Sequence, residues 1–275
     1  MVSPEPVGPE PPAPVPPVPP VLQAEGISVS FGGVRAVDEV SLHVGPGEIV
    51  GLVGPNGSGK STMLNALTGL VPATGTVSVD GTPIHRVRPG TMRRAGVLRT
   101  FQTPQVFPEL TGLENVLLSH PDTAMTRLLG SWIARPSMLA HERRRWADAM
   151  AALEQVGQRS VADVPAGELS YGQQRLVEVA RVICGHPRIV LLDEPGAGLN
   201  QAETNDFAEL LAGLRASGVP LLVVDHKIDF LDRLCDRLVV LQLGRVVADG
   251  PPAMVWNDPT VVDAYLGRRS GAGGR

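Results

Sequence analysis

The chain has 275 residues, a formal net charge of −4 and a sequence pI near 5.9. General nucleic-acid binding requires a basic surface, which this acidic balance disfavours. It also uses aromatic side chains on which bases stack, and aromatic residues make up only 4% of the chain. No apolar run approaches the roughly 18–20 residues that span a bilayer, and residues 1–6 lack the basic and apolar regions of an export signal. We therefore expect a cytoplasmic protein that binds no nucleic acid and reaches a membrane only through a partner.

Residues 1–20 form the first segment of the chain and contain ten prolines. They show no apolar periodicity, and such a composition favours extended polyproline II over a packed element. We predict a disordered tail here, with a proline-rich docking motif as the alternative. Residues 268–275, which are rich in glycine and arginine, are also predicted to be a disordered tail.

Between these tails, apolar strands alternate with helices, which predicts an α/β fold on a mainly parallel sheet with helices on both faces. Up to residue 102 we predict a helix at Lys60–Leu67 and strands at Leu22–Phe31, Ala36–Val44, Glu48–Val53, Thr76–Val79 and Gly96–Phe101. Helical periodicity then dominates residues 103–186, which predicts an inserted helical subdomain with helices at Leu113–Ser119, Met138–Val156 and Tyr171–Cys184. Strands return at Arg188–Leu192, Leu221–Val224, Leu238–Leu243 and Arg245–Ala248.

Residues 54–61 match the glycine-rich phosphate loop G-x-x-x-x-G-K-[ST]. They follow a short apolar strand and open a helix, so that backbone N–H groups and the helix N-terminus face one anion. Lys60 can reach the β- and γ-phosphates of a nucleotide, and the Ser61 hydroxyl can ligate Mg²⁺. A structural glycine turn is the alternative, but the flanking strand and helix favour nucleotide binding. The nucleotide-binding residues predicted here are Gly54, Pro55, Asn56, Gly57, Ser58, Gly59, Lys60, Ser61 and Thr62.

Two carboxylates, Asp193 and Glu194, follow an apolar strand. Ligands bind at the carboxyl edge of a parallel sheet, which places Asp193 to hold Mg²⁺ and Glu194 to accept a proton from the attacking water. His226 occupies the same position after Leu221–Val224 and is predicted to contact the γ-phosphate. A cap or surface acidic pair before Pro195 and a structural histidine are the alternatives.

Residues 170–173 read as a capping box that starts a helix, with Ser170 as N-cap and Gln173 three residues later. That structural role does not account for Gly172, because glycine is a poor helix former. A glycine in the first turn lets a phosphate approach the helix dipole and its exposed N–H groups. We therefore predict a second anion site at Ser170, Gly172 and Gln173, far along the chain from the phosphate loop.

Two isolated side chains complete the predicted site. Gln102 leaves a strand toward the helical block and suits a metal or water ligand, although the sequence supports a structural role equally. Phe31 is one of few aromatic residues and could stack on adenine, with a core position as the alternative. The arginines at 143–145 are interpreted as a solvated helix face rather than a lipid or nucleic-acid patch.

In this order the motifs resemble those of the ATP-binding-cassette (ABC) ATPases, over about residues 21–267. The resemblance implies a P-loop sheet core at about 21–102 and 187–250 with an antiparallel β edge, a helical subdomain at about 103–186 and C-terminal helices at about 251–267. It assigns residues 54–61 to the Walker A loop, Gln102 to the Q-loop, Leu169–Gln173 to the signature, Ile189–Asp193 to the Walker B strand, Glu194 to the catalytic base, Gly196–Asn200 to the D-loop, His226 to the switch histidine and Phe31 to the adenine-stacking aromatic.

The resemblance also implies a working assembly. Members of the family dimerise head to tail, so that each ATP lies between one Walker A loop and the partner's signature. ATP and Mg²⁺ are the implied cofactors. The implied partners are a second ABC ATPase subunit, in a homo- or heterodimer, two integral-membrane permease subunits coupled through residues 102–115, and a separate solute-binding protein. This assembly would hold the chain at the inner face of the cell membrane.

A narrower resemblance points to the branched-chain amino acid importer branch, on residues 31–37, 99–102, 169–175, 194–200 and 250–267. The chain departs from that branch at residues 225–227, Asp-His-Lys where Glu-His-Asp is commoner, and at Gln201, where proline is usual. The implied activity is hydrolysis of ATP to ADP and phosphate, coupled to solute uptake. An importer of urea, amides or other small solutes, an exporter, and a soluble ATPase acting on nucleic acid or ribosomes are the alternatives.

Overall fold

The computed structural model describes residues 19–121 and 135–266, and the strands of this part form two sheets. The larger sheet has the strand order β10-β9-β3-β8-β7-β6, with parallel pairing throughout except between β9 and β10. Its strands are β3 (Ile49–Val53), β6 (Val97–Arg99), β7 (Ile189–Asp193), β8 (Leu221–Val224), β9 (Arg237–Gln242) and β10 (Arg245–Gly250).

The smaller sheet is antiparallel and has the order β2-β1-β4-β5. Its two long strands form a hairpin that runs from the pair Leu22 and Val44 to the pair Phe31 and Val34 beside the Gly32-Gly33 turn. Its strands are β1 (Leu22–Phe31), β2 (Val34–Val44), β4 (Thr74–Val79) and β5 (Thr82–Pro83).

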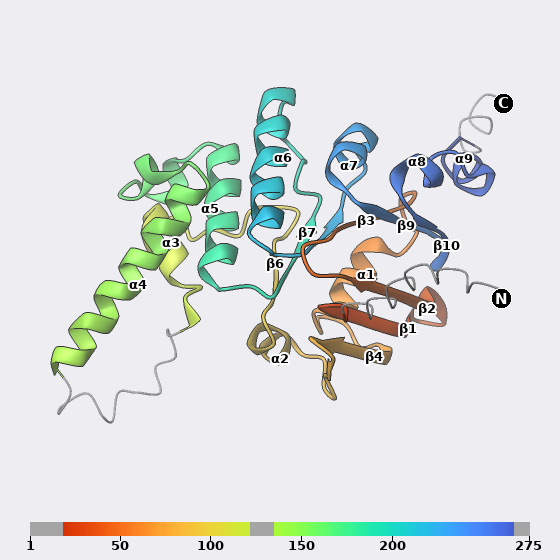
Figure 1. The fold of residues 1–275 in the computed structure, drawn as a ribbon, viewed down its shortest axis with the longest axis horizontal. Helices are drawn as coiled ribbons and strands as arrows, with labels where there is room; N and C mark the ends of the chain where they lie inside the picture. Colours follow the sequence, from red (N-terminus) through yellow and green to blue (C-terminus); the bar gives the residue numbers. More distant parts are fainter. Residues whose placement is uncertain (1–18, 122–134, 267–275) are drawn as a thin grey trace, which may run out of the picture.

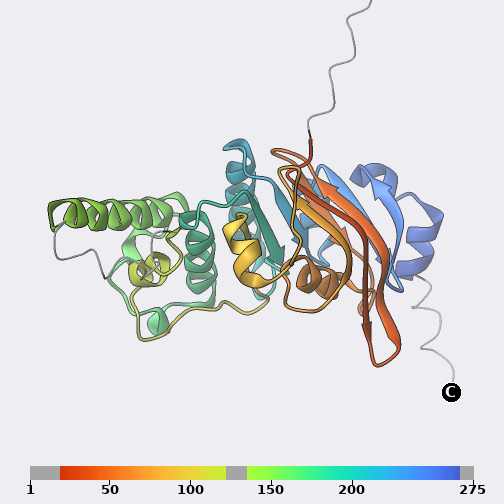
Figure 2. The ribbon, with the colours of Figure 1, turned by 90° about the horizontal axis from the view of Figure 1, so that it is seen from below.

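The helices form a block at one end of the molecule and a layer along the larger sheet. Figure 1 shows α3, α4 and α5 together at one end and α8 and α9 at the other, and Figure 2 shows α4 extending away from the sheets. None of the described helices is long and apolar enough to cross a membrane. The helices are α1 (Lys60–Leu67), α2 (Pro89–Arg94), α3 (Gly112–Leu117), α4 (Arg135–Gln155), α5 (Tyr171–Cys184), α6 (Gln201–Ala216), α7 (Ile228–Leu234), α8 (Pro252–Val255) and α9 (Pro259–Leu266).

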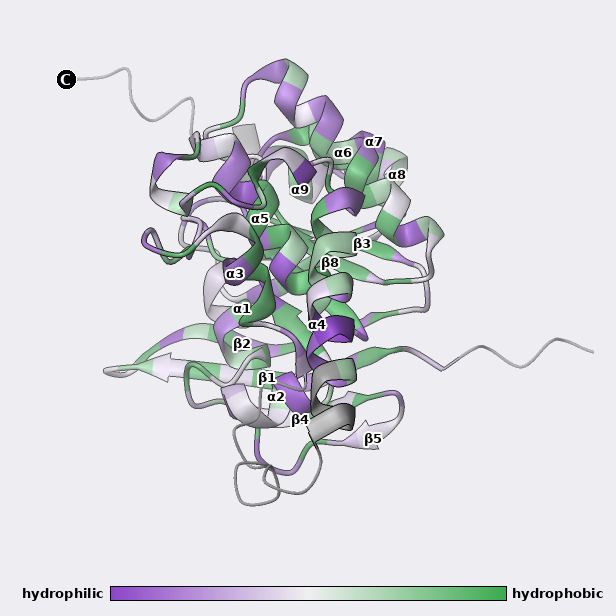
Figure 3. Ribbon diagram, turned by 90° about the vertical axis from the view of Figure 1, so that its left-hand side faces the viewer, coloured by the Kyte–Doolittle hydropathy of each residue, from purple (hydrophilic) through white to green (hydrophobic). Residues whose placement is uncertain are grey.

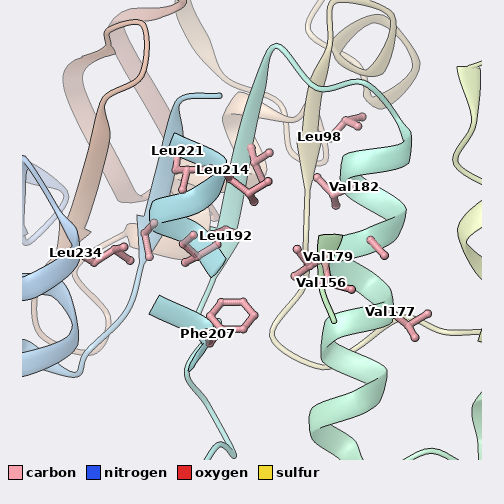
Figure 4. Packing of buried hydrophobic residues seen from close by; sticks show 14 of the residues in the cluster. Leu98, Val156, Val177, Val179, Val182, Leu192, Phe207, Leu214, Leu221 and Leu234 are labelled. Carbon is pink, nitrogen blue, oxygen red and sulfur yellow. The ribbon is translucent and has the colours of Figure 1, made fainter. Parts of the chain in front are cut away.

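The central parallel strands are buried on both faces because their side chains alternate between two cores. On β3, Val50 and Leu52 enter a core with α1 and the antiparallel sheet, whereas Ile49 and Val53 enter a core under the helices α5, α6 and α7. Figure 3 shows the resulting apolar character of β3 and β8. Figure 4 shows the second core, where Phe207 of α6 lies among residues of β7, β8 and α5.

These features confirm the predicted fold class: a mainly parallel sheet core, an antiparallel edge and a helical block inserted between β6 and β7. Helices lie on both faces of the larger sheet as expected, with α1 packed on the second face together with the antiparallel sheet. The helices α2, α6 and α7 were not placed by the sequence analysis. The two predicted disordered tails lie outside the described residues, apart from Pro19 and Pro20. The numerical domain boundaries stay a prediction.

Candidate nucleotide site

The loop between β3 and α1 depends on three glycines with left-handed backbone angles. The φ angles of Gly54, Gly57 and Gly59 are 149°, 81° and 107°. A Cβ on Gly54 would lie 2.2 Å from the carbonyl oxygen of Leu241, and one on Gly59 would lie 2.4 Å from that of Ala36. A Cβ on Gly57 would meet nothing within 4 Å, so only its backbone angle requires glycine there. The loop is thus held tightly between β9 and β2.

This loop fits the phosphates of a nucleotide. The helix α1 begins directly after it without a side-chain cap, so its first N–H groups are available to an anion. The Ser58 hydroxyl is buried and has no hydrogen-bond partner, which leaves a polar atom inside the loop to be satisfied. Asn56, Gly57 and Ser61 are exposed, while Thr62 is half-buried. The predicted binding residues therefore line one continuous turn.

Lys60 is the first residue of α1, directly after the loop, and is mostly buried. Its Nζ donates hydrogen bonds to the carbonyl oxygens of Gly54 at 2.7 Å and Pro55 at 3.1 Å. Burial lowers the pKa of the Lys60 ammonium, while the nearby carboxylates of Glu194 and Asp193 act to raise it. The structure thus brings the predicted lysine and both predicted carboxylates into one electrostatic neighbourhood.

Asp193, the last residue of β7, forms a buried ion pair that the sequence analysis missed. Its Oδ2 lies 2.6 Å from Nη2 of Arg99, which ends the neighbouring strand β6. The guanidinium of Arg99 also donates to Oδ1 of Asn65 on α1 at 2.7 Å. Because β6 and β7 are far apart in the chain, only their pairing in the sheet could reveal this contact. Asp193 is therefore fixed at the sheet edge facing α1.

Glu194 and Gln102, which were predicted separately as the general base and as a metal or water ligand, lie in direct contact. Nε2 of Gln102 donates to Oε2 of Glu194 at 2.7 Å. The Glu194 N–H donates to the carbonyl oxygen of Val224 at 2.7 Å, and its φ of 46° is left-handed. For a residue other than glycine such a backbone conformation costs roughly 1–2 kcal/mol and marks a candidate functional position.

His226 follows β8 at the same sheet edge, since β8 pairs with β7 through Val224 and Asp193. Its side chain is 58% exposed, and its Nδ1 lies 3.8 Å from Oδ1 of Asp225. Phe31 ends β1 and is half exposed, so it is not a core residue, which excludes the alternative weighed for it. Both side chains are therefore free to meet a ligand.

The second predicted anion site lies at the start of α5. The capping box is confirmed, because the Gln173 N–H donates to Ser170 Oγ at 3.3 Å and the Ser170 N–H to Gln173 Oε1 at 3.0 Å. A Cβ on Gly172 would first meet Glu203 of α6 at 3.4 Å. The three predicted residues share a pocket of about 500 Å³ with Leu199 and Glu203. This pocket is separate from the phosphate loop, which lies at the start of α1.

A second group of residues that the sequence analysis missed fixes the segment around Gln102 to α5. Arg175 has no exposed surface and donates to the carbonyl oxygens of Phe101 and Gln102, while its Nη1 lies 3.0 Å from Glu178 Oε2. Glu178 accepts the N–H groups of Phe101 at 3.2 Å and Gln105 at 3.3 Å. Burial raises the pKa of Glu178 and outweighs the opposing effect of Arg175. The available signal was a charged pair within an otherwise apolar helix face.

Tyr171 connects the same segment to the residues after Glu194. Its hydroxyl donates to the carbonyl oxygen of Gln102 at 3.2 Å. Its ring lies against Gly198, where a Cβ would come within 2.8 Å of Tyr171 Cε1. The second candidate anion site, the Gln102 segment and Gly198 therefore all contact the first two turns of α5.

Known proteins resemble the chain along most of its length. The "ABC transporter" family model matches residues 37–197, and the "Branched-chain amino acid ATP-binding cassette transporter" model matches residues 245–270. The high-affinity branched-chain amino acid transport ATP-binding protein BraF of Pseudomonas aeruginosa is 39% identical, over 90% of this chain and 98% of BraF.

Solved structures agree. The ADP conformation of MJ1267, an ATP-binding cassette of an ABC transporter, is 34% identical with a TM-score of 0.78, covering 90% of this chain and 99% of that one. The dimeric post-hydrolysis state of the ATP-binding cassette MJ0796, bound to ADP and phosphate, is 27% identical with a TM-score of 0.69 and covers 84% and 98%.

The fold and the phosphate loop together define a nucleotide-binding P-loop ATPase. The chain belongs to the ATP-binding-cassette family of transporter ATPases. Within that family, its similarity is to the ATP-binding proteins of branched-chain amino acid transport. This confirms the family and the branch expected from the motifs.

Proposed function

We propose that this chain is the ATP-hydrolysing subunit of a membrane importer for branched-chain amino acids. The cargo class is supported by BraF and by the match of residues 245–270. The single observation that supports ATP hydrolysis is the 2.7 Å hydrogen bond from Gln102 to Glu194, at the sheet edge beside the phosphate loop. The alternative functions that the experiment must distinguish are an importer of urea, amides or other small solutes, and an exporter.

The phosphate loop and the start of α1 bind the nucleotide phosphates through backbone N–H groups, and Phe31 stacks on the adenine. Lys60 turns its ammonium from the loop carbonyls toward the β- and γ-phosphates. The hydroxyl of Ser61, the side-chain carbonyl oxygen of Gln102 and the carboxylate of Asp193 would supply oxygen ligands of the kind that Mg²⁺ prefers. When bound, that ion would neutralise negative charge on the β- and γ-phosphates.

Glu194 acts as the general base in this proposal. It accepts a proton from the attacking water, while Gln102 orients the carboxylate through its amide. His226 donates to the γ-phosphate from the next strand over. The pairing of β7 with β8 supports these roles, because it keeps Glu194 and His226 at one edge. Burial of the Lys60 ammonium strengthens its attraction to phosphate, since solvent screening there is weak.

The second anion site supports a composite site shared by two ATPase subunits. Ser170, Gly172 and Gln173 line a pocket away from the phosphate loop of their own chain. In a head-to-tail homo- or heterodimer they would contact the γ-phosphate held by the partner's phosphate loop. The dimeric cassette MJ0796 shows that a relative of this fold assembles in pairs.

Contact with two integral-membrane permease subunits is proposed at a groove of about 260 Å³. Phe101 and Gln105 line it from the Gln102 segment, together with Arg93 and Arg181. Phe107, which is half exposed, lies beside the Arg181 guanidinium, at 5.7 Å from the ring centre. An apolar segment of a permease loop with acidic flanks would suit these side chains. The chain would then sit peripherally on the inner face of the membrane, with a separate solute-binding protein outside.

Purification from detergent-solubilised membranes of the native host tests this function. Mass spectrometry should find multi-span permease subunits. Transport of labelled leucine, isoleucine and valine into vesicles that contain the assembly then identifies the cargo. Uptake of urea or amides instead would replace the cargo. Reproducible recovery of ribosomal or DNA-repair proteins without permeases would overturn the transporter role.

A further inference from the structure

The loop after β8 carries a buried carboxylate that no proposed catalytic step uses. Asp225 is 1% exposed. Its Oδ1 accepts the N–H groups of His226 at 2.7 Å and Lys227 at 3.0 Å, and its Oδ2 accepts the N–H of Gly196 at 3.1 Å. One side chain therefore binds both its own loop and the segment that follows Glu194.

Lys227 makes the reciprocal contact. Its Nζ donates to the carbonyl oxygen of Gly196 at 2.7 Å and lies 3.4 Å from both the carbonyl oxygen of Leu199 and Oγ1 of Thr204. Lys227 occupies the N-cap position of α7 but makes no side-chain cap there. Its long side chain instead reaches residues 196–204, whereas the side chain of the neighbouring His226 is exposed to solvent.

Gly196 fits beneath these two side chains. A Cβ at this position would lie 3.1 Å from Asp225 Oδ2, 3.6 Å from Lys227 Cδ and 3.7 Å from Lys227 Nζ. The Asp225 carboxylate accepts a hydrogen bond from the N–H of Gly196, and the Lys227 ammonium donates one to its carbonyl oxygen. Both backbone polar groups of Gly196 are therefore bound by the opposite loop. Hydrogen bonds with a charged partner are the stronger ones, which makes this a firm attachment.

We infer that Asp225 and Lys227 are positioning residues that tie the His226 loop to residues 196–199, so that Glu194 and His226 are held as one unit. The inference rests on the proposed roles of Glu194 and His226. The contacts themselves belong to the chain alone and can be tested without nucleotide.

Hydrogen exchange of the full chain, read by mass spectrometry without nucleotide, tests the attachment. Lys227→Met removes the ammonium and keeps the length of the side chain. Because a hydrogen bond to a charged group is lost, exchange should rise by roughly tenfold or more in residues 196–199 and in residues 226–227 together. Lys227→Arg, which keeps the charge and the donors, should restore most of the protection. Arg233→Met removes the same charge from the exposed face of α7 and should change neither segment.

Steady-state hydrolysis separates positioning from simple stability. Lys227→Met should lower kcat by about tenfold while KM for ATP and the melting temperature stay near the wild-type values. Unchanged exchange in either segment, or a rise in exchange with an unchanged kcat, would overturn the inference. Glu194→Gln serves as the reference for the proposed function. If Glu194→Gln hydrolyses ATP normally, the proposed base is wrong, whereas the exchange of residues 196–199 still decides whether the attachment exists.

Discussion

Replacing Arg175 by methionine tests how firmly α5 holds the Gln102 segment. The guanidinium of Arg175 has no exposed surface, pairs with Glu178 at 3.0 Å and donates to the carbonyl oxygens of Phe101 and Gln102. Methionine fills similar volume but removes the charge and these donors. Glu178, which is 4% exposed, would then be a buried carboxylate without its cation.

Breaking a buried ion pair from one side costs about 3–5 kcal/mol. A domain is stable by only about 5–15 kcal/mol, so Arg175→Met should remove roughly a third of the stability. For a chain of this size that loss lowers the melting temperature by roughly 10 °C. Adding Glu178→Gln should recover part of it, because the glutamine is neutral and its carbonyl oxygen can still accept the N–H groups of Phe101 and Gln105.

The deficit of Arg175→Met should also depend on pH. Burial already raises the pKa of Glu178 above 4.5 in the folded protein, and Arg175 opposes that effect. Without Arg175 the folded pKa rises further. Stability from a group with a raised folded pKa is full below the unfolded pKa and is lost as pH rises through the folded pKa. The deficit should therefore shrink as the pH falls through the raised pKa of Glu178 and the carboxylate becomes protonated.

Urea unfolding of the wild type, both variants and a control at pH 8 and about pH 5 measures these effects. Arg144→Met, an exposed arginine on α4 in the same helical block, is the matched control and should change stability by less than about 0.5 kcal/mol. A deficit below about 1 kcal/mol for Arg175→Met, or one that stays constant with pH, would refute the reasoning.

Three further predictions concern the phosphate loop and the first tail. Lys60→Ala should weaken ATP binding because the ammonium at the loop is lost, and equilibrium titration with a fluorescent ATP analogue would show an unchanged Kd if the assignment is wrong. Gly59→Ala should lower the melting temperature more than Gly57→Ala, since only the first Cβ meets a backbone oxygen, at 2.4 Å; equal losses would contradict this. Deleting residues 2–20 should leave ATPase activity intact, and a large loss would show a function for that segment.

Local signals in the sequence predicted α5 to the residue, because a capping box at Ser170 marks its start and an apolar periodicity continues to Cys184. A similar capping box at Asn200 and Glu203 starts α6, yet the sequence analysis did not place that helix. The buried residues Thr204, Phe207, Leu211 and Leu214 have the spacing of an amphipathic helix, so both the cap and the period were available in the sequence. The short helix α2 has too few residues for any period to show.

Contacts within one segment could be anticipated from the sequence, whereas contacts between distant segments could not. The phosphate loop has a contiguous motif, whereas the Arg99 pair with Asp193 and the Arg175 contacts with residues 101–102 join parts of the chain about 70 to 95 residues apart. Such contacts depend on strand order and helix packing, which the sequence specifies only through the folded core. Gln102 was predicted as a metal or water ligand, and its contact with Glu194, 92 residues away, was missed for the same reason.

The most direct test of the central claim is ATP turnover by Glu194→Gln in the assembly purified with its membrane subunits. Loss of the proposed general base should lower turnover by about a hundredfold or more, while ATP stays bound at the site. The matched Arg144→Met assembly should hydrolyse ATP at the wild-type rate. Wild-type turnover by Glu194→Gln would contradict the account, because Glu194 would then have no part in the hydrolysis that this site is proposed to perform.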